Sequence, residues 1–169
     1  VKDSYMDVLS LAEWRAVYTG RQWGVMGYFL PEFDAEHSKM IEPTRGLAAL
    51  VMLHDVAVWP IWSNINVWNT MYDALDKFGY VDSTFIPYWS PQPPASTDMK
   101  DVYISAYKRA DGRALLVVGN TSREPRSGTV TLNAAALGLP VGKALLWPDG
   151  TPLPDENGKV QVSMDGLDY

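Results

Sequence analysis

Three tryptophans stand within the stretch VWPIWSNINVW, and the middle one, Trp62, is followed directly by Ser63 and Asn64. An indole ring offers a flat apolar face that stacks on the C–H surface of a sugar ring, and an amide hydrogen-bonds sugar hydroxyls. Trp62 and Asn64 together supply both kinds of contact. This pair is therefore our first candidate for a carbohydrate-binding site, although an asparagine at this position also suits the N-cap of a helix.

Four further side chains are candidates for substrate contact at the same site. Arg21 and Trp23 precede a predicted strand, Glu32 follows it, and Trp59 lies in the next predicted strand. Trp23 could instead cover the start of its strand, and Trp59 fits the core better than a ligand site. Asp34 stands two residues after Glu32, and two carboxylates on one loop are poorly placed to flank a glycosidic bond. We expect both to be solvated loop residues, and the sequence assigns no catalytic residue.

Other kinds of catalytic site find no support. His54 and Asp55 are adjacent, but no G-x-S-x-G pattern offers a serine nucleophile, and the chain has no cysteine. The second histidine, His37, falls on a predicted loop without metal-ligand spacing to the first. We expect no metal and no cofactor, and we expect His54 to interact with the last carbonyls of its helix.

The composition bounds the partners. The 169 residues carry a formal net charge of −6, with 47% hydrophobic residues and 7 tryptophans, so the chain can bury a core and lacks the basic stripe that binds nucleic acid. The longest apolar runs, such as 47–53, are far shorter than the roughly 20 residues that span a bilayer, and no membrane partner is expected. The lack of cysteine leaves the location open, and a secreted or periplasmic one is compatible with it.

The first eighty residues alternate helical and strand-like runs. Helices are predicted over 11–19, with Ser10 and Glu13 as a capping box, over 44–55, and from Asn64 or Asn66 to the stop at Gly79. Strands are predicted over 24–30 and 56–62. Such alternation implies parallel strands covered by helices, and two strands are too few for a parallel sheet. We therefore expect these to be the last strand–helix repeats of a (β/α)8-type barrel whose earlier repeats lie in a larger protein.

Later residues follow a different pattern. A proline-rich connector over 85–98 separates a first domain, 1–84, from a second, 99–169, in which strand runs alternate with Asp-Gly and Asn-Gly turns. The fold class is thus α/β followed by all-β, the second domain being an antiparallel β-sandwich. Trp147 is expected to pack between its sheets. Arg45, in the first turn of a predicted helix, opposes the helix dipole, which suggests that a carboxylate or a ligand holds it.

Several segments resemble a known family. AYKRADGRALLVVGNTS (106–122) resembles the start of the C-terminal β-domain of many glycoside hydrolases, and YTGRQWG, TRGLAALVMLHD and VWPIWSN resemble the last barrel repeats of bacterial proteins akin to glycoside hydrolase family 123. The resemblance covers almost all of this chain and a minority of such a protein. In that family the catalytic acidic pair lies on a middle barrel strand, so the resemblance implies no catalytic residue here.

The leading hypothesis is a C-terminal portion of a carbohydrate-active glycoside hydrolase that completes the sugar-binding end of the barrel. Its partners would be an oligosaccharide or glycan and the N-terminal barrel portion of the same protein. One alternative is a non-catalytic carbohydrate-binding or adhesion module, which predicts exposed aromatic rings on the sandwich, for instance Tyr103 and Tyr107. Another is a structural domain without ligand.

Overall fold

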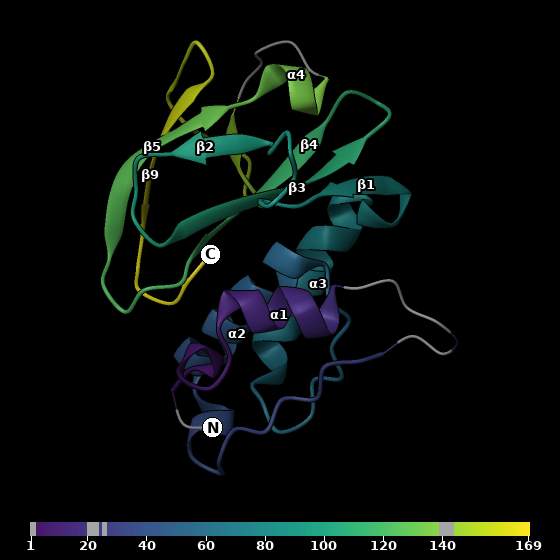
Figure 1. Cartoon of the computed structure of the whole chain (residues 1–169), viewed down its shortest axis with the longest axis vertical. Helices are drawn as coiled ribbons and strands as arrows, with labels where there is room; N and C mark the ends of the chain where they lie inside the picture. Colours follow the sequence, from purple (N-terminus) through teal and green to yellow (C-terminus); the bar gives the residue numbers. More distant parts are fainter. Residues whose placement is uncertain (1–2, 20–23, 25–26, 139–143) are drawn as a thin grey trace.

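The helical part of the chain contains three main helices, α1 (Leu11–Tyr18), α2 (Ile41–His54) and α3 (Ile65–Phe78). Single turns of 3-10 helix, η1 (Tyr5–Asp7), η2 (His37–Lys39) and η3 (Tyr80–Asp82), stand between or beside them. The structure is a computed structural model that describes residues 3–19, 24, 27–138 and 144–169. In Figure 1 the helices lie together below the strands, with α2 and α3 running under the first sheet.

The predicted ends of α1 and α3 are confirmed, whereas α2 begins at Ile41, three residues before its predicted start. The Ser10 side chain accepts the Glu13 backbone N–H while the Glu13 carboxylate accepts the Ser10 N–H, which is the expected capping box. Asn64 caps α3, and Gly79 ends it in the left-handed region at φ 79°. Because local side chains satisfy these backbone groups, sequence alone locates the ends.

Of the strands predicted over 24–30 and 56–62, the structure shows a single parallel bridge between Phe29 and Val58, and residues 25 and 26 lie outside the described residues. The Phe29 N–H donates to the Ala57 carbonyl at 2.7 Å, and the Trp59 N–H donates to the Phe29 carbonyl at 3.0 Å. The parallel direction is as predicted, whereas the predicted lengths are wrong. A parallel pair needs neighbouring strands, and no further strand pairs with this bridge within the described ranges. The barrel repeats therefore stay a prediction.

Two antiparallel sheets form most of the second half of the chain. One has the order β1 (Ser83–Ile86), β3 (Val102–Arg109), β4 (Ala114–Asn120), and the other β2 (Ala95–Thr97), β5 (Arg126–Leu132), β9 (Lys159–Met164), β8 (Asp155–Glu156). Helix α4 (Ala134–Leu137) follows β5, and β6 (Leu145–Leu146) pairs with β7 (Thr151–Pro152). The predicted turns at Asp111-Gly112 and Asn157-Gly158 join β3 to β4 and β8 to β9. The second half is therefore mostly β, as predicted, but it also contains helix α4.

The first sheet is covered on both faces. Val102 and Ile104 belong to a core cluster shared with Val130 of the second sheet, while Tyr107 and Val117 belong to the larger cluster of the helices. Successive side chains of a strand point to opposite faces, so β3 contributes to both cores. The molecule therefore has three layers: helices, first sheet and second sheet (Figure 1).

Two sequence predictions about the second half need correction. Trp147 does not lie between the sheets, because its indole N–H donates to the Ala74 carbonyl of α3 at 2.8 Å and its ring packs beside Phe78. The segment predicted to connect the domains, 85–98, contains β2 and the end of β1. Pro87 follows the end of β1 and Pro94 precedes the start of β2, so these prolines bound the strands rather than preventing them. The division into two domains stays a prediction.

Candidate carbohydrate-binding surface

The segment after Gly27 alternates strictly between buried and exposed side chains. Phe29 and Phe33 are buried against the helices, whereas Tyr28 and Leu30 are exposed. Glu32, two residues after Leu30, is also exposed. Alternation with a period of two is the signature of an extended chain with one covered face. Tyr28, Leu30 and Glu32 therefore share the uncovered face.

Trp59 joins this surface through the parallel bridge. Val58, the bridge partner of Phe29, is buried, so the next residue, Trp59, projects to the opposite side and is 63% exposed. We call Tyr28, Leu30 and Trp59 the aromatic face. The prediction that Trp59 is a core residue is wrong for the described residues, because nothing among them covers this side of the bridge.

Trp62 lies three residues further on, in a tight turn after the bridge. It is 54% exposed, and its backbone has a φ of 53°, in the left-handed region that non-glycine residues rarely adopt. By contrast, Trp68 is 0% exposed and donates its indole N–H to the Ser63 hydroxyl at 2.8 Å. The prediction that Trp68 is a packing residue is confirmed. The Trp62 side chain is therefore not enclosed by the protein, and its backbone is in a conformation that a tryptophan rarely adopts.

Asn64 connects α3 to the residues around the start of α2 through three hydrogen bonds. Its side-chain oxygen accepts the Asn66 N–H at 3.0 Å, its amide donates to the Lys39 carbonyl at 2.8 Å, and its backbone N–H donates to the Thr44 hydroxyl at 3.0 Å. The N-cap alternative is confirmed. A carbohydrate contact by Asn64 stays a prediction.

The remaining candidates are separated by the structure. Arg21 and Trp23 lie outside the described residues. The Glu32 backbone N–H donates to the Tyr5 hydroxyl, which fixes the chain beneath the aromatic face. Asp34 accepts the backbone N–H of His37 at 3.0 Å and its ring nitrogen at 2.8 Å, and these bonds hold the pKa of Asp34 at about 2. Asp34 is therefore a loop anchor, in line with the loop position that the sequence predicts.

The two histidines have separate structural roles. His54 is buried, with Nδ1 2.7 Å from the Leu50 carbonyl oxygen and Nε2 3.2 Å from the Tyr88 hydroxyl. Burial lowers the pKa of His54, so its ring is neutral at pH 7. His37 instead pairs with Asp34. Among the residues that the structure describes, no three potential ligands gather into a metal site.

Arg45 is held by the last described residues of the chain. Its Nε lies 2.6 Å from the Asp168 carboxylate, a second nitrogen donates to the Tyr169 carbonyl at 3.2 Å, and the guanidinium lies 4.7 Å from the Tyr169 ring centroid. The predicted carboxylate partner is thus Asp168. This contact ties the start of α2 to the segment after β9.

Of the two exposed rings that the sandwich alternative predicts, Tyr107 is buried and Tyr103 is half-buried. The Tyr107 hydroxyl donates to the Asp55 carboxylate at 2.9 Å. Tyr103, on the same side of β3, packs against Tyr88 at a ring distance of 4.9 Å. Both rings lie on the side of the sheet that the helices cover.

The comparisons with known proteins add one finding. Residues 56–150 match the family model described as "Glycoside hydrolase 123, C-terminal domain". No curated protein and no solved structure matches the chain. The matched region begins within the bridge segment, so it includes Trp59, Trp62 and α3 as well as most of the two sheets. Within the described ranges no helix is long and apolar enough to cross a membrane.

Proposed function

This chain belongs to the glycoside hydrolase 123 family through its C-terminal domain, and from that premise we propose that it completes the sugar-binding end of the hydrolase's barrel. In this proposal the aromatic face and Trp62 contact an oligosaccharide, and the catalytic acids come from other repeats of the same protein. The exposure of Trp59 and Trp62, in a molecule that buries Trp14 and Trp68 completely, is the observation that carries it.

The position of these rings supports a role in substrate contact. In a (β/α)8 barrel the residues that bind substrate lie at the carboxyl ends of the strands and in the loops that follow. Glu32 follows the Phe29 segment and Trp62 follows the Val58 segment, so both stand at the carboxyl end of the parallel bridge. Stacked aromatic rings give a sugar site its apolar platform.

The open bridge supports a partner of the same architecture. Side chains on the aromatic face of a barrel strand would point into the barrel, where the remaining strands cover them. Scattered exposed apolar residues are ordinary on a protein surface. Here, however, Trp59 and its apolar neighbours lie together at the bridge, and Trp62 follows in the next turn, which indicates an interaction surface. We therefore propose that preceding strand–helix repeats of the same protein cover Tyr28, Leu30 and Trp59 and leave Trp62 at the substrate cleft.

Oxidative footprinting of tryptophan tests both contacts. The oxidation rate of each tryptophan is measured by mass spectrometry in this chain alone, in the complete hydrolase, and in the hydrolase with an oligosaccharide that it cleaves. We expect Trp59 to be protected in the complete hydrolase and Trp62 to be protected further by the oligosaccharide. Trp68, which is fully buried, is the control and should react slowly throughout. Equal oxidation of Trp62 with and without the oligosaccharide would contradict the proposed substrate contact. Equal oxidation of Trp59 in the chain alone and in the complete hydrolase would contradict the proposed barrel contact.

A further inference from the structure

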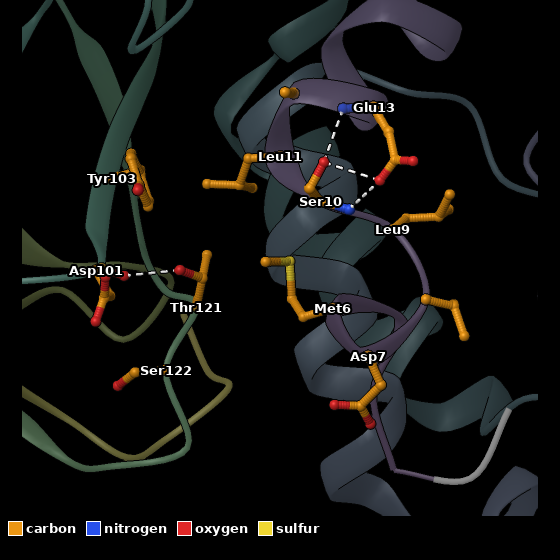
Figure 2. A pocket seen from close by; sticks show the side chains of 12 residues that line it. Met6, Asp7, Leu9, Ser10, Leu11, Glu13, Asp101, Tyr103, Thr121 and Ser122 are labelled. Atoms are coloured by element: carbon orange, nitrogen blue, oxygen red, sulfur yellow. Dashed lines mark hydrogen bonds between the residues drawn. The ribbon is translucent and has the colours of Figure 1, made fainter.

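A groove of about 650 Å³ opens where the helical layer stops covering the first sheet. Residues 6–13, from η1 to the first turn of α1, form one wall, and Asp101 and Tyr103 at the start of β3, with Thr121 and Ser122 after the end of β4, form the other. Figure 2 shows the two walls facing each other. The volume falls within the roughly 300–1,000 Å³ typical of small-molecule sites. The groove shares no residue with the aromatic face.

The groove has an apolar floor. Figure 2 shows Leu11 and Met6 pointing from the helical wall toward the strand that carries Tyr103 and toward Thr121. Tyr103 is half-buried, and its contact with Tyr88 fixes the ring. The Tyr103 ring on one wall and the apolar side chains that face it from the other offer the kind of surface on which the C–H face of a pyranose packs.

The serine and threonine hydroxyls that line the groove already use their protons, so they can only accept further hydrogen bonds. The Thr121 hydroxyl donates to the Asp101 carbonyl at 2.9 Å, and the Ser122 hydroxyl donates to the Asn120 side-chain oxygen at 2.9 Å. The Ser10 hydroxyl donates to the Glu13 carboxylate at 2.8 Å. Each hydroxyl has one proton, which these bonds use, while its oxygen can still accept from a further donor. These hydroxyls therefore favour a ligand that carries several hydrogen-bond donors.

The charged groups of the groove argue against an anionic ligand. Its ionisable side chains besides Tyr103 are all carboxylates: Asp7, Glu13 and Asp101. Arg123 binds Asp7 at 2.8 Å, and Arg126 lies 3.8 Å from Asp101. These arginines already neutralise two of the three carboxylates, so the groove attracts a cationic ligand only weakly. The remaining negative charge of Glu13 repels an anionic ligand.

We propose that this groove binds a neutral saccharide, whose hydroxyls donate to Thr121, Ser122 and the carboxylates and whose apolar face packs on Tyr103. The site is separate from the aromatic face, and it does not depend on the function proposed above. It gives the chain a glycan contact of its own.

A titration of the isotope-labelled chain with lactose and with chitobiose, followed by amide NMR, tests the proposal. We expect shifts at Leu11, Ala12, Thr121 and Ser122 with at least one of these neutral sugars. Sialyllactose, which adds a carboxylate to lactose, should bind at least about tenfold more weakly, a factor equivalent to about 1.4 kcal/mol. The absence of shifts with both neutral sugars, equal binding of sialyllactose, or shifts confined to residues 59–64 would overturn the proposal.

Two matched variants locate the site. Ala12 lines the groove, whereas Ala16 stands one turn later on the same helix and outside it, and both are exposed. Ala12→Arg should place a donor-rich side chain across the acceptors and abolish the sugar-dependent shifts, and Ala16→Arg should leave them unchanged. Ala12→Gln and Ala16→Gln repeat the comparison without adding charge near the start of α1. Equal effects at the two positions would contradict binding in the groove.

Discussion

At the scale of single residues, Asn120 shows how a buried polar side chain organises a loop. Its amide donates to the Glu124 and Asp165 carbonyls, both at 2.8 Å, and its oxygen accepts from Ser122. The sequence Asn120-Thr121-Ser122 fits a glycosylation acceptor, but the Asn120 side chain is 1% exposed and engaged on both sides. Asn120 is a structural residue that holds one wall of the groove.

Replacing Asn120 should therefore destabilise the fold. Asn120→Ala removes one hydrogen-bond donor from the Asp165 carbonyl and one from the Glu124 carbonyl, which keeps the Ser122 hydroxyl, and each lost hydrogen bond costs about 0.5–1.5 kcal/mol. Urea unfolding should show a loss of this order. Asn69→Ala, on the exposed side of α3, is the control and should be close to neutral. A neutral Asn120→Ala would show that the loop does not depend on this side chain.

The buried His54 predicts a pH dependence of stability. Burial lowers its folded pKa below the ordinary 6.5, and the charge of Arg15 acts in the same direction. As pH falls below 6.5, the unfolded chain binds a proton that the folded chain does not, so the free energy of unfolding decreases until pH passes the folded pKa. His54→Phe keeps a ring beside Trp89 and should flatten this part of the profile.

His37 provides the control for that profile, because its pKa is raised by the hydrogen bond to Asp34. Its contribution is present at low pH and is lost as pH rises through the folded pKa, which is the opposite sign. Unfolding midpoints measured between acidic and neutral pH distinguish the two. An unchanged slope in His54→Phe would mean that His54 titrates normally in the folded state.

At the scale of elements, the close contact of α2 with β4 fixes how the helical layer sits on the first sheet. A Cβ built on Gly119 would lie 2.6 Å from Cδ1 of Leu53, a side chain that is 0% exposed. The Leu53 side chain of α2 therefore packs directly against the backbone of β4 at Gly119. Nearby, the Ser105 hydroxyl of β3 donates to the Leu53 carbonyl at 2.8 Å.

Gly119→Ala should overpack this contact and cost about 1–3 kcal/mol. The measurement is the free energy of unfolding of Gly119→Ala, Leu53→Val and the double variant. Because Leu53→Val removes volume at the same place, the double variant should lose less than the two single losses together. Strict additivity would mean that the added methyl group finds room without displacing Leu53.

The elements also show where sequence reasoning succeeds. The capping box at Ser10, the cap at Asn64 and the Asn157-Gly158 turn depend on neighbours within a few residues, so the sequence alone predicts them. It does not predict the shortness of the Phe29 and Val58 strands, because strand length depends on partners elsewhere. It also misplaces Trp147, since the partner of this ring, Ala74 of α3, is far away in the sequence.

At the scale of the whole molecule, the same distinction applies to the site. The sequence indicates Trp62, Asn64 and Trp59, and the structure exposes both tryptophans but uses Asn64 as a cap. Which side of a strand is covered cannot be read from one strand alone, so the sequence places Trp59 wrongly in the core. The residues of the groove come from both halves of the chain, and no local pattern connects them.

The three layers predict that the sheets do not fold without the helices. A fragment of residues 83–169 keeps both sheets but exposes Tyr107, Val117 and the rest of the helix-facing side of the first sheet. We expect it to aggregate or to unfold without cooperativity, whereas the whole chain unfolds in one transition. Sedimentation and thermal unfolding followed by circular dichroism compare the two. A monomeric fragment that unfolds cooperatively would establish the sandwich as an independent domain.

The Michaelis constant of Trp62→Gly in the complete hydrolase tests the central claim most directly. Glycine accepts the left-handed backbone of Trp62, whose strain costs about 1–3 kcal/mol, and the lost ring is exposed, so the fold should be as stable as before or more stable. The account predicts that the Michaelis constant rises by about tenfold or more, because losing the stacking of Trp62 on the sugar costs about 1.4 kcal/mol of binding free energy. An unchanged constant in a stable Trp62→Gly enzyme would contradict it.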